Sequence, residues 1–185
     1  MKYFTIMLLL IGINQHADAQ SSLFKPFKID IGIVGAVSLD DEAGNGPGFY
    51  LEPKYQASDR INVGLRLESV FLTSGSISIG PTAVDLEAAS VFPILLTGDY
   101  YFNTERVRPY AGLGIGVYIK DETSINTDIG IVNFDLGSKT NFGVAPRLGL
   151  NAGHFKLAII YNYTGDGIAD YLGISIGAEI GGGYQ

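Results

Sequence analysis

The sequence predicts an all-β protein that folds as an eight-stranded antiparallel up-and-down transmembrane β-barrel. Three observations support this prediction. Apolar side chains alternate with polar or small ones along most of the chain, no segment shows a helical period, and short connections alternate with long ones. The length of 185 residues fits a single barrel domain.

The clearest alternation lies in the segment from Ser90 to Lys120, which predicts two strands joined by a polar turn at Asn103–Arg108. One face of this hairpin is apolar, and the opposite face mixes glycine, tyrosine and charged residues. Two chemically distinct faces are typical of a sheet with an apolar environment on one side. The apolar face comprises Phe92, Ile94, Leu96, Tyr100, Phe102, Ala111, Leu113, Ile115, Val117 and Ile119.

The same alternation predicts the other strands in chain order. They cover residues 27–39, 49–56 and 61–71 before the hairpin, and residues 140–151, 155–164 and 171–180 after it. Tight turns are expected at Ser58–Arg60, Asn103–Arg108 and Ala152–His154. Long connections are expected at Asp40–Gly48, Thr73–Ala89 and Asp121–Gly137, and a Gly- and Asp-rich loop is expected at Gly165–Asp170.

The third long connection contains the apolar residues Ile129, Ile131 and Phe134, so it either forms a loop or extends the flanking strands. The alternation of tight turns with long connections is typical of transmembrane barrels, which have short periplasmic turns and long extracellular loops. An even number of strands then places both chain termini on the periplasmic side.

Aromatic residues on the outward-facing parity collect at the two ends of the predicted strands. Phe27, Tyr55, Tyr100, Phe102 and Phe155 lie near the tight turns, and Phe49, Phe71, Phe92, Phe142, Tyr161 and Tyr163 lie toward the long connections. Aliphatic residues occupy most positions between them. Two aromatic girdles around an aliphatic belt are what the two interfaces of a membrane select.

Three prolines fall inside predicted strands, namely Pro53, Pro93 and Pro146. Each removes one hydrogen bond from a ladder, because proline has no backbone N–H. We expect β-bulges to accommodate them, although alternation alone does not place the bulges.

Residues 1–19 are predicted to be a secretory signal peptide, which leaves residues 20–185 as the barrel domain. Lys2 precedes an apolar segment at Phe4–Ile13, and Ala17-Asp18-Ala19 offers a cleavage site. The alternative, an uncleaved anchor helix, is disfavoured because the apolar segment is too short. The chain has no cysteine, which excludes a cysteine-linked lipid anchor and disulfides, and its net charge of -7 argues against nucleic acid as a partner.

The central hairpin resembles that of the OmpA/OmpX-type small outer-membrane β-barrel family. The resemblance rests on the sequence from Asp99 to Asn103 and on that from Arg108 to Gly116, and the strand pattern extends it over nearly the whole mature chain. It implies an outer-membrane location in a Gram-negative bacterium of the Bacteroidetes type, and assembly by the barrel assembly machinery. Such barrels usually end on an aromatic residue, whereas this chain continues past Ile180 to Tyr184 and Gln185.

The residues that small barrel enzymes require are not present in the required places. After removal of the signal peptide, His154 is the one histidine, and it lies in a tight turn on the predicted periplasmic side. A lipid A acyl-group hydrolase or transferase needs a histidine near the outer leaflet, and an omptin-type protease needs one at the extracellular rim. We therefore predict no enzymatic activity, no cofactor and no metal.

Gly112, Gly114 and Gly116 lie inside a predicted strand that no helix follows, so they do not form a phosphate-binding loop. We expect them to leave room for tyrosine or arginine side chains in the lumen. The predicted outer loops are acidic, which favours solvation. Divalent-ion binding beside lipopolysaccharide phosphates is the alternative, although the spacing matches no EF-hand loop. The acidic residues are Asp40, Asp41, Glu42, Asp121, Glu122, Asp128, Asp135, Asp166 and Asp170.

An eight-stranded barrel has an interior just wide enough for side chains. The inward-facing parity supplies charges of both signs, and Arg66 and Arg147 are expected to connect the carboxylates through bidentate contacts. Separate solvation of these charges by lumen water is the alternative. The predicted lumen network comprises Glu52, Lys54, Arg66, Glu68, Asp99, Arg147 and Glu179, with Lys120 and Lys156 as further inward-facing charges.

The predicted function is that of a monomeric, non-enzymatic integral outer-membrane barrel with a filled polar lumen. It is either envelope-structural or presents acidic extracellular loops for adhesion, with outer-membrane lipid and lipopolysaccharide as its surroundings. The alternatives are a narrow porin-like channel and a small-ligand-binding barrel. A secreted lipocalin-like carrier would have its apolar residues inside the barrel and its polar residues outside. The polar face of these strands, which is rich in glycine and carries Arg, Lys and Glu, suits the outer surface of such a carrier poorly.

Overall fold

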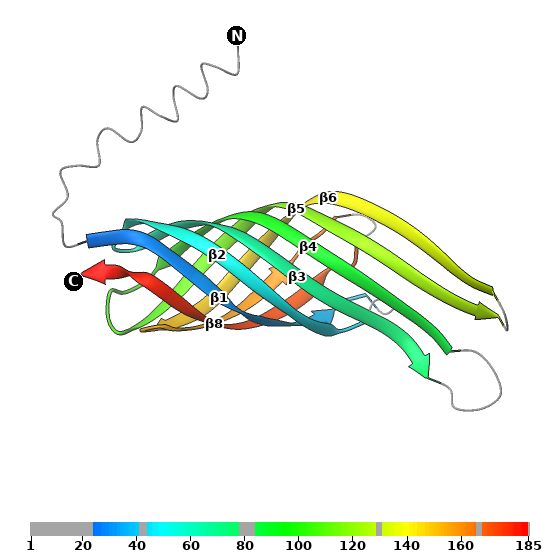
Figure 1. Cartoon of the computed structure of the whole chain (residues 1–185). Helices are drawn as coiled ribbons and strands as arrows, with labels where there is room; N and C mark the ends of the chain where they lie inside the picture. The colour runs from blue at the N-terminus through cyan, green and yellow to red at the C-terminus, as the bar shows by residue number, and fades with distance from the viewer. Residues whose placement is uncertain (1–23, 41–43, 78–83, 129–130, 166–167, 185) are drawn as a thin grey trace, which may run out of the picture.

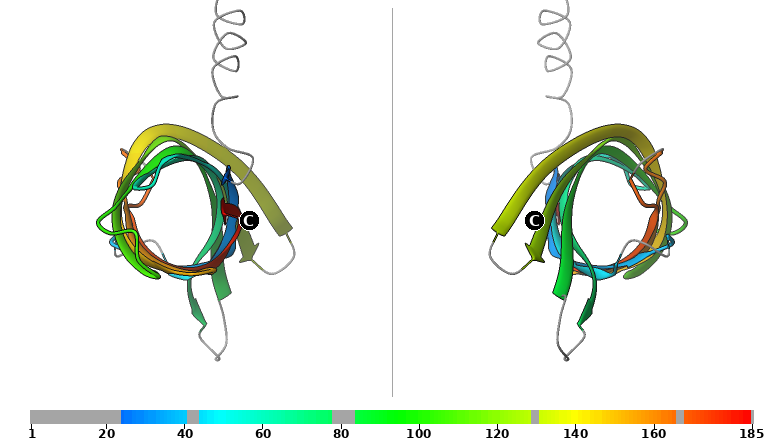
Figure 2. Two further views of the ribbon diagram at one scale, coloured as in Figure 1. Left: turned by 90° about the vertical axis from the view of Figure 1, so that its left-hand side faces the viewer. Right: turned by 90° about the vertical axis from the view of Figure 1, so that its right-hand side faces the viewer.

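The computed structural model describes residues 24–40, 44–77, 84–128, 131–165 and 168–184. These residues form one closed barrel of antiparallel strands, in which each strand pairs with its neighbours in sequence and β1 pairs with β8 (Figures 1 and 2). The strands are β1 (Phe24–Ser38), β2 (Gly46–Ser58), β3 (Ile61–Ile77), β4 (Val84–Tyr101), β5 (Val107–Asp128), β6 (Ile131–Ala152), β7 (Phe155–Asn162) and β8 (Tyr171–Tyr184). The eight-stranded antiparallel barrel predicted from the sequence is therefore confirmed, while the predicted signal peptide lies outside the described residues.

The two ends of the barrel differ. At one end, called here the terminal end, lie the start of β1, the end of β8 and the short turns (Figure 1). At the other end, called the hairpin end, the β3–β4 and β5–β6 hairpins extend beyond the rest of the wall (Figure 1). In these hairpins the ladders continue to Ile77 opposite Val84 and to Asp128 opposite Ile131.

These extensions correct the predicted loop at 73–89, most of which forms strands, and they show that the 121–137 segment extends its flanking strands. The reason is that alternation reveals a strand only when its two faces meet different surroundings. Segments such as Thr73-Ser-Gly-Ser-Ile77 are polar on both faces, so they keep their ladder hydrogen bonds without showing an apolar parity. β7 is conversely shorter than predicted and ends at Asn162.

The prediction of β-bulges at the prolines is wrong. The register is the same on both sides of Pro53 in the β2–β3 ladder, where Leu51 pairs with Leu67 and Lys54 with Gly64. The β3–β4 ladder likewise keeps one register across Pro93, and Val144 still bridges Tyr163 beyond Pro146. Each proline thus lacks a partner in one of the two ladders of its strand, and neither strand contains the inserted residue that defines a bulge.

The register shifts lie elsewhere, between Lys25 and Lys28 in the β1–β8 ladder and between Gln56 and Ser58 in the β2–β3 ladder. At the first of these, Gly181 and Gly182 have φ values of 87° and 73°, which glycine adopts without a steric penalty. The shift allows β8 to continue past Ile180 alongside the start of β1.

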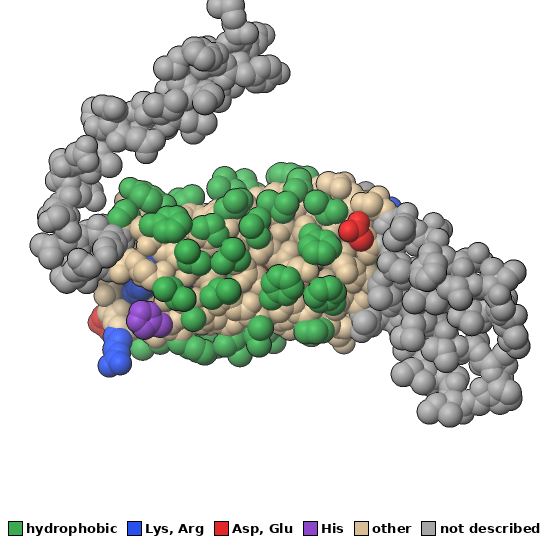
Figure 3. Space-filling model, viewed as in Figure 1, with side chains coloured by type: hydrophobic (Ala, Val, Ile, Leu, Met, Phe, Trp, Pro, Cys, Tyr) green, Lys and Arg blue, Asp and Glu red, His purple; other side chains and the backbone are tan. Residues whose placement is uncertain are grey.

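The outer wall of the barrel is apolar over most of its height (Figure 3). Exposed aliphatic residues such as Leu65, Ile115 and Ile159 lie between the two groups of aromatic residues predicted from the sequence. Phe142, at 67% exposure, would be costly to hold in water as part of so large an apolar surface. A hydrocarbon surrounding removes that cost, as expected for a transmembrane barrel. None of the described residues forms a helix long and apolar enough to cross a membrane.

The apolar belt predicts a dependence of stability on depth. Ile159 lies in the middle of β7, whereas Phe102 lies just after the end of β4, near the terminal end. Their exposed fractions are nearly equal, at 53% and 55%, so the two residues differ in height on the wall but hardly in burial. In lipid vesicles, we expect Ile159→Arg to cost about 2–4 kcal/mol and Phe102→Arg about 0–1 kcal/mol, because a charge is least tolerated at the bilayer midplane. Denaturant unfolding monitored by gel mobility measures both. Equal costs would contradict the assignment of the belt.

Candidate functional site

The lumen holds the charged side chains that the barrel buries. Among the described residues, the buried charged groups are five cations and five carboxylates, so the buried charge is balanced. The chain as a whole carries -7, and this excess therefore lies outside the balanced lumen set. The cations are Lys28, Lys54, Arg66, Arg147 and Lys156, and the carboxylates are Asp30, Glu52, Glu68, Asp99 and Glu179.

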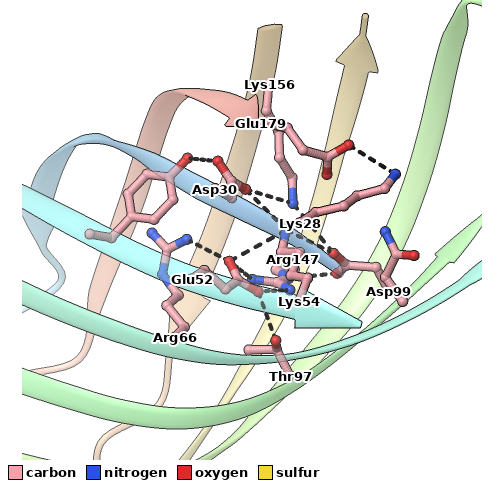
Figure 4. Close-up of polar contacts among 12 residues, drawn as sticks. Lys28, Asp30, Glu52, Lys54, Arg66, Thr97, Asp99, Arg147, Lys156 and Glu179 are labelled. Carbon is pink, nitrogen blue, oxygen red and sulfur yellow. Dashed lines mark hydrogen bonds and ion pairs between the residues drawn. The ribbon is translucent and has the colours of Figure 1, made fainter. Parts of the chain in front are cut away.

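Glu52 lies at the centre of the lumen and is completely buried (Figure 4). Arg147 donates two hydrogen bonds to it, from Nη2 to Oε1 at 2.7 Å and from Nη1 to Oε2 at 3.1 Å. The hydroxyl of Thr97 donates to Oε1 at 2.7 Å, and Nη1 of Arg66 donates to Oε2 at 3.3 Å. A carboxylate surrounded by this many donors is satisfied without bulk water.

Next to Glu52, two lysines and two aspartates form a closed ring of alternating charge. Nζ of Lys54 lies 3.0 Å from Oδ2 of Asp30 and 3.5 Å from Oδ2 of Asp99. Nζ of Lys156 lies 3.1 Å and 3.3 Å from the same two oxygen atoms. Arg147 joins the ring to Glu52, because its Nε lies 2.8 Å from Oδ1 of Asp99.

On the side toward the hairpin end, Arg66 extends the network to Glu68. Its Nε and Nη2 lie 2.7 Å and 2.6 Å from Oε2 of Glu68, and its guanidinium group stacks 3.7 Å from the centre of the Tyr50 ring. Tyr171 donates its hydroxyl to the other oxygen of Glu68 at 3.1 Å. Tyr50 donates to Asp30 at 3.0 Å, which returns the network to β1.

The network therefore links opposite walls of the barrel. Its members come from β1, β2, β3, β4, β6 and β7, and Tyr171 adds β8. Because these side chains are buried and contact one another directly, each charge depends on its partners for its stabilisation. The network fills the space that the ribbon views leave open at the centre of the barrel (Figures 2 and 4).

The structure brings six of the seven predicted network residues together and places the seventh apart. The expected contact of Glu179 with Arg66 or Arg147 is not found. It pairs with Lys28 at 3.2 Å and lies 3.8 Å from Nη2 of Arg108, toward the terminal end. Lys120 is half-buried, whereas Lys156 is a full member of the ring.

Sequence reasoning missed Lys28, Asp30 and Thr97 as members of the lumen set. All three lie on the inward parity of their strands, and Lys28 and Asp30 alternate directly with the outward Phe27, Ile29 and Ile31. The parity rule that selected Glu52 and Lys54 would have found them.

One of the three glycines in β5 provides space for the network. A Cβ at Gly112 would collide with Oδ1 of Asp99 and lie 3.0 Å from Nε of Arg147. The expected role of making room for an arginine therefore fits Gly112. Gly114 and Gly116 instead face Leu95 and Ala145, and the backbone of Ile94.

The described residues offer no arrangement of catalytic groups around a histidine. His154 lies in the β6–β7 turn at the terminal end, and its Nδ1 is 2.9 Å from the carbonyl oxygen of Glu179. Because Glu179 N also donates to the His154 carbonyl at 2.7 Å, the residue fastens the turn to β8. Within the described ranges, no group of three or more histidine, cysteine, aspartate or glutamate side chains has the geometry of a metal site.

Comparison with known proteins supports the fold. No family model and no curated protein matches the sequence. Among solved structures, the chain is similar to the outer-membrane protein Ail of Yersinia pestis in a phospholipid nanodisc, with a TM-score of 0.51 and 18% identity over 86% of this chain and 100% of Ail. It is also similar to the outer-membrane protein OprG of Pseudomonas aeruginosa, with a TM-score of 0.51 and 16% identity over 83% of this chain and 95% of OprG.

These identities are low, so the likeness concerns the fold alone. The chain has the fold of the small eight-stranded outer-membrane β-barrels, which agrees with the resemblance to OmpA/OmpX-type barrels seen in the central hairpin.

The network predicts that Arg147 is the most sensitive lumen residue. In lipid vesicles, Arg147→Ala is expected to cost about 3–5 kcal/mol of unfolding free energy, because it leaves buried carboxylates without their partner. Arg106→Ala, in the exposed β4–β5 turn, is the matched control and should leave stability unchanged. Denaturant titration of both variants measures the difference. Similar stabilities for the two variants would show that lumen water replaces the arginine.

Proposed function

We propose that the protein is a non-enzymatic integral outer-membrane barrel that is closed to ions and presents its hairpin end outside the cell. The observation that carries this proposal is the inverted distribution of side chains. The outer wall is apolar between two aromatic girdles, and the buried charges form a balanced network within the lumen. A barrel of this kind is stable in a bilayer and has no open polar path through its centre.

The proposed orientation rests on the unequal ends. The short turns, the start of β1 and the end of β8 gather at the terminal end, and short turns are typical of the periplasmic end of bacterial outer-membrane barrels. The predicted signal peptide supplies the export that such a location requires. The start of β1 and the end of β8 are paired, so both termini are proposed to be periplasmic.

The lumen supports neither the channel nor the carrier alternative. The transluminal contacts of Arg147, Lys54 and Lys156 occupy the centre of the barrel, where a channel would need continuous water. A soluble carrier would need an apolar cavity inside and a polar wall outside. The exposed wall of this barrel is apolar instead.

The absence of enzymatic activity is proposed from the position of His154. The turn that carries it lies at the terminal end, away from the proposed outer leaflet, and its Nδ1 lies 2.9 Å from the backbone carbonyl oxygen of Glu179. A lipid-modifying reaction at the outer leaflet would need its proton-transfer group at the hairpin end.

The proposed external role is the presentation of acidic hairpins. The segment from Asp121 to Gly137 contains no lysine or arginine and four acidic residues, namely Asp121, Glu122, Asp128 and Asp135. With outer-membrane lipid and lipopolysaccharide as surroundings, such hairpins suit either an envelope-structural role or contact with a basic surface. We propose that the protein acts as a monomer inserted by the barrel assembly machinery.

Gel mobility and planar-bilayer recording together test the proposed function. The purified protein should migrate differently when unboiled, because an intact barrel resists unfolding by detergent. It should also show no stable conductance after insertion into a planar bilayer, because the lumen is filled. Recovery as a detergent-independent soluble protein would contradict the location, and a stable nanosiemens-scale conductance would contradict the closed lumen.

The orientation predicts which insertions are reachable on intact cells. Epitope tags at Gly75 and Asn126, in the two protruding hairpins, should be labelled by antibody. Tags at Asp59 and Glu105, in the short turns, should be labelled only after the outer membrane is permeabilised. The reverse pattern would contradict the proposed orientation.

A further inference from the structure

Three buried residues near the terminal end carry polar atoms that have no hydrogen-bond partner among the described residues. They are Tyr110 on β5, Asn151 on β6 and Glu179 on β8, and none is more than 3% exposed. The atoms concerned are the hydroxyl of Tyr110, Nδ2 and Oδ1 of Asn151, and Oε2 of Glu179. This group, called here the terminal cluster, is buried and polar, and the ion network does not satisfy it.

The strand register places the members of the terminal cluster next to one another. The Tyr110 ring lies against Gly149, two residues before Asn151, since a Cβ at Gly149 would lie 2.6 Å from Cζ of Tyr110. Asn151 itself pairs with Arg108 across the β5–β6 ladder. Oε1 of Glu179 lies 3.8 Å from Nη2 of Arg108, so these two side chains join β8 to β5. Because β6 and β7 separate β5 from β8 on the wall, this pair spans the inner face that carries Asn151.

The unpartnered atoms of the terminal cluster need both donors and acceptors. Nδ2 of Asn151 only donates, Oδ1 of Asn151 and Oε2 of Glu179 only accept, and the Tyr110 hydroxyl does both. A bound anion would satisfy Nδ2 but would be repelled by the Glu179 carboxylate. A bound cation would leave Nδ2 without a partner and would be repelled by Arg108 and Lys28, which both lie beside Glu179. Water donates and accepts, and a buried water molecule typically makes about three hydrogen bonds.

We infer that the terminal cluster is a hydration site, in which ordered water bridges Tyr110, Asn151 and Glu179. A buried polar atom without a partner is destabilising, and folded proteins satisfy nearly all such atoms through protein groups or bound water. The side chain of Arg108 is 19% exposed, so solvent reaches the edge of the cluster from the terminal end. This inference rests on the proposed closed barrel and adds a bound-water site to the proposed periplasmic side of its ion network.

Nuclear Overhauser effects between water and protein protons test the inference on the isotope-labelled barrel in lipid nanodiscs. The side-chain amide protons of Asn151 should show cross-peaks to water with the sign of a bound water molecule, which differs from the sign of chemical exchange. An exchanging hydroxyl proton of Tyr110 could relay such a signal. The measurement is therefore repeated on Tyr110→Phe, which has no hydroxyl and should keep the cross-peaks, because water still bridges Asn151 and Glu179.

Substitution of Asn151 gives an independent readout through the denaturant midpoint of unfolding in lipid vesicles. Asn151→Leu is similar in shape and removes both unpartnered atoms. In a hydrated cluster it breaks the contacts of the water, so the midpoint should fall, whereas in a dry cluster it removes a destabilising amide and the midpoint should rise. Asn151→Ser is the matched control. It keeps a donor and an acceptor for water, so its midpoint should lie between those of the native protein and Asn151→Leu.

The absence of water cross-peaks at Asn151, or a higher midpoint for Asn151→Leu, would overturn the hydration site. Loss of the cross-peaks in Tyr110→Phe would assign them to the hydroxyl proton and would overturn it as well. If Asn151→Leu does not fold, the cross-peaks of the native chain and of Tyr110→Phe decide. None of these results involves a conductance of the native protein, which is the separate observation that would contradict the proposed function.

Discussion

The buried carboxylate of Glu52 is the constraint on which the rest of this structure depends. An ionised carboxylate in a narrow lumen inside a membrane has no bulk water to solvate it, so the protein must supply donors from several strands. Arg147 supplies two of them and Arg66 and Thr97 supply others. Since those residues lie on β6, β3 and β4, Glu52 on β2 is satisfied only when the barrel is closed.

The same requirement explains why the buried charge is balanced while the whole chain is acidic. Five cations and five carboxylates among the described buried residues leave no uncompensated charge in the lumen. The acidic excess remains where water can solvate it. The outer wall can then be apolar over most of its height, because no charged residue is needed there for solubility. A membrane supplies the surrounding that this wall requires.

The sequence predicted the strand number, the topology and the two faces, because alternation and girdle position depend only on the local pattern and the surrounding medium. It did not predict where strands end in the protruding hairpins, because segments such as that before Ile77 are polar on both faces. It also failed at Pro53, Pro93 and Pro146, because a ladder can omit one pairing and keep its register.

For the site, parity identified the inward charges but not their partners. Whether Glu179 contacts an arginine or Lys28 depends on the stagger between strands that close the barrel, which alternation does not contain. Gly112 shows the same limit. A side chain at this position would collide with Asp99 and Arg147, and this becomes apparent only when the positions of those two side chains are known.

The central claim is that charges across the lumen solvate one another directly. A double-mutant cycle with Glu52→Gln and Arg147→Met, measured by reversible unfolding in lipid vesicles, tests it most directly. Direct contact predicts a coupling free energy of about 2–3 kcal/mol, because the two side chains share a bidentate contact. Additive effects of the two substitutions, with a coupling free energy near zero, would show that water solvates each charge separately and would contradict direct contact between them.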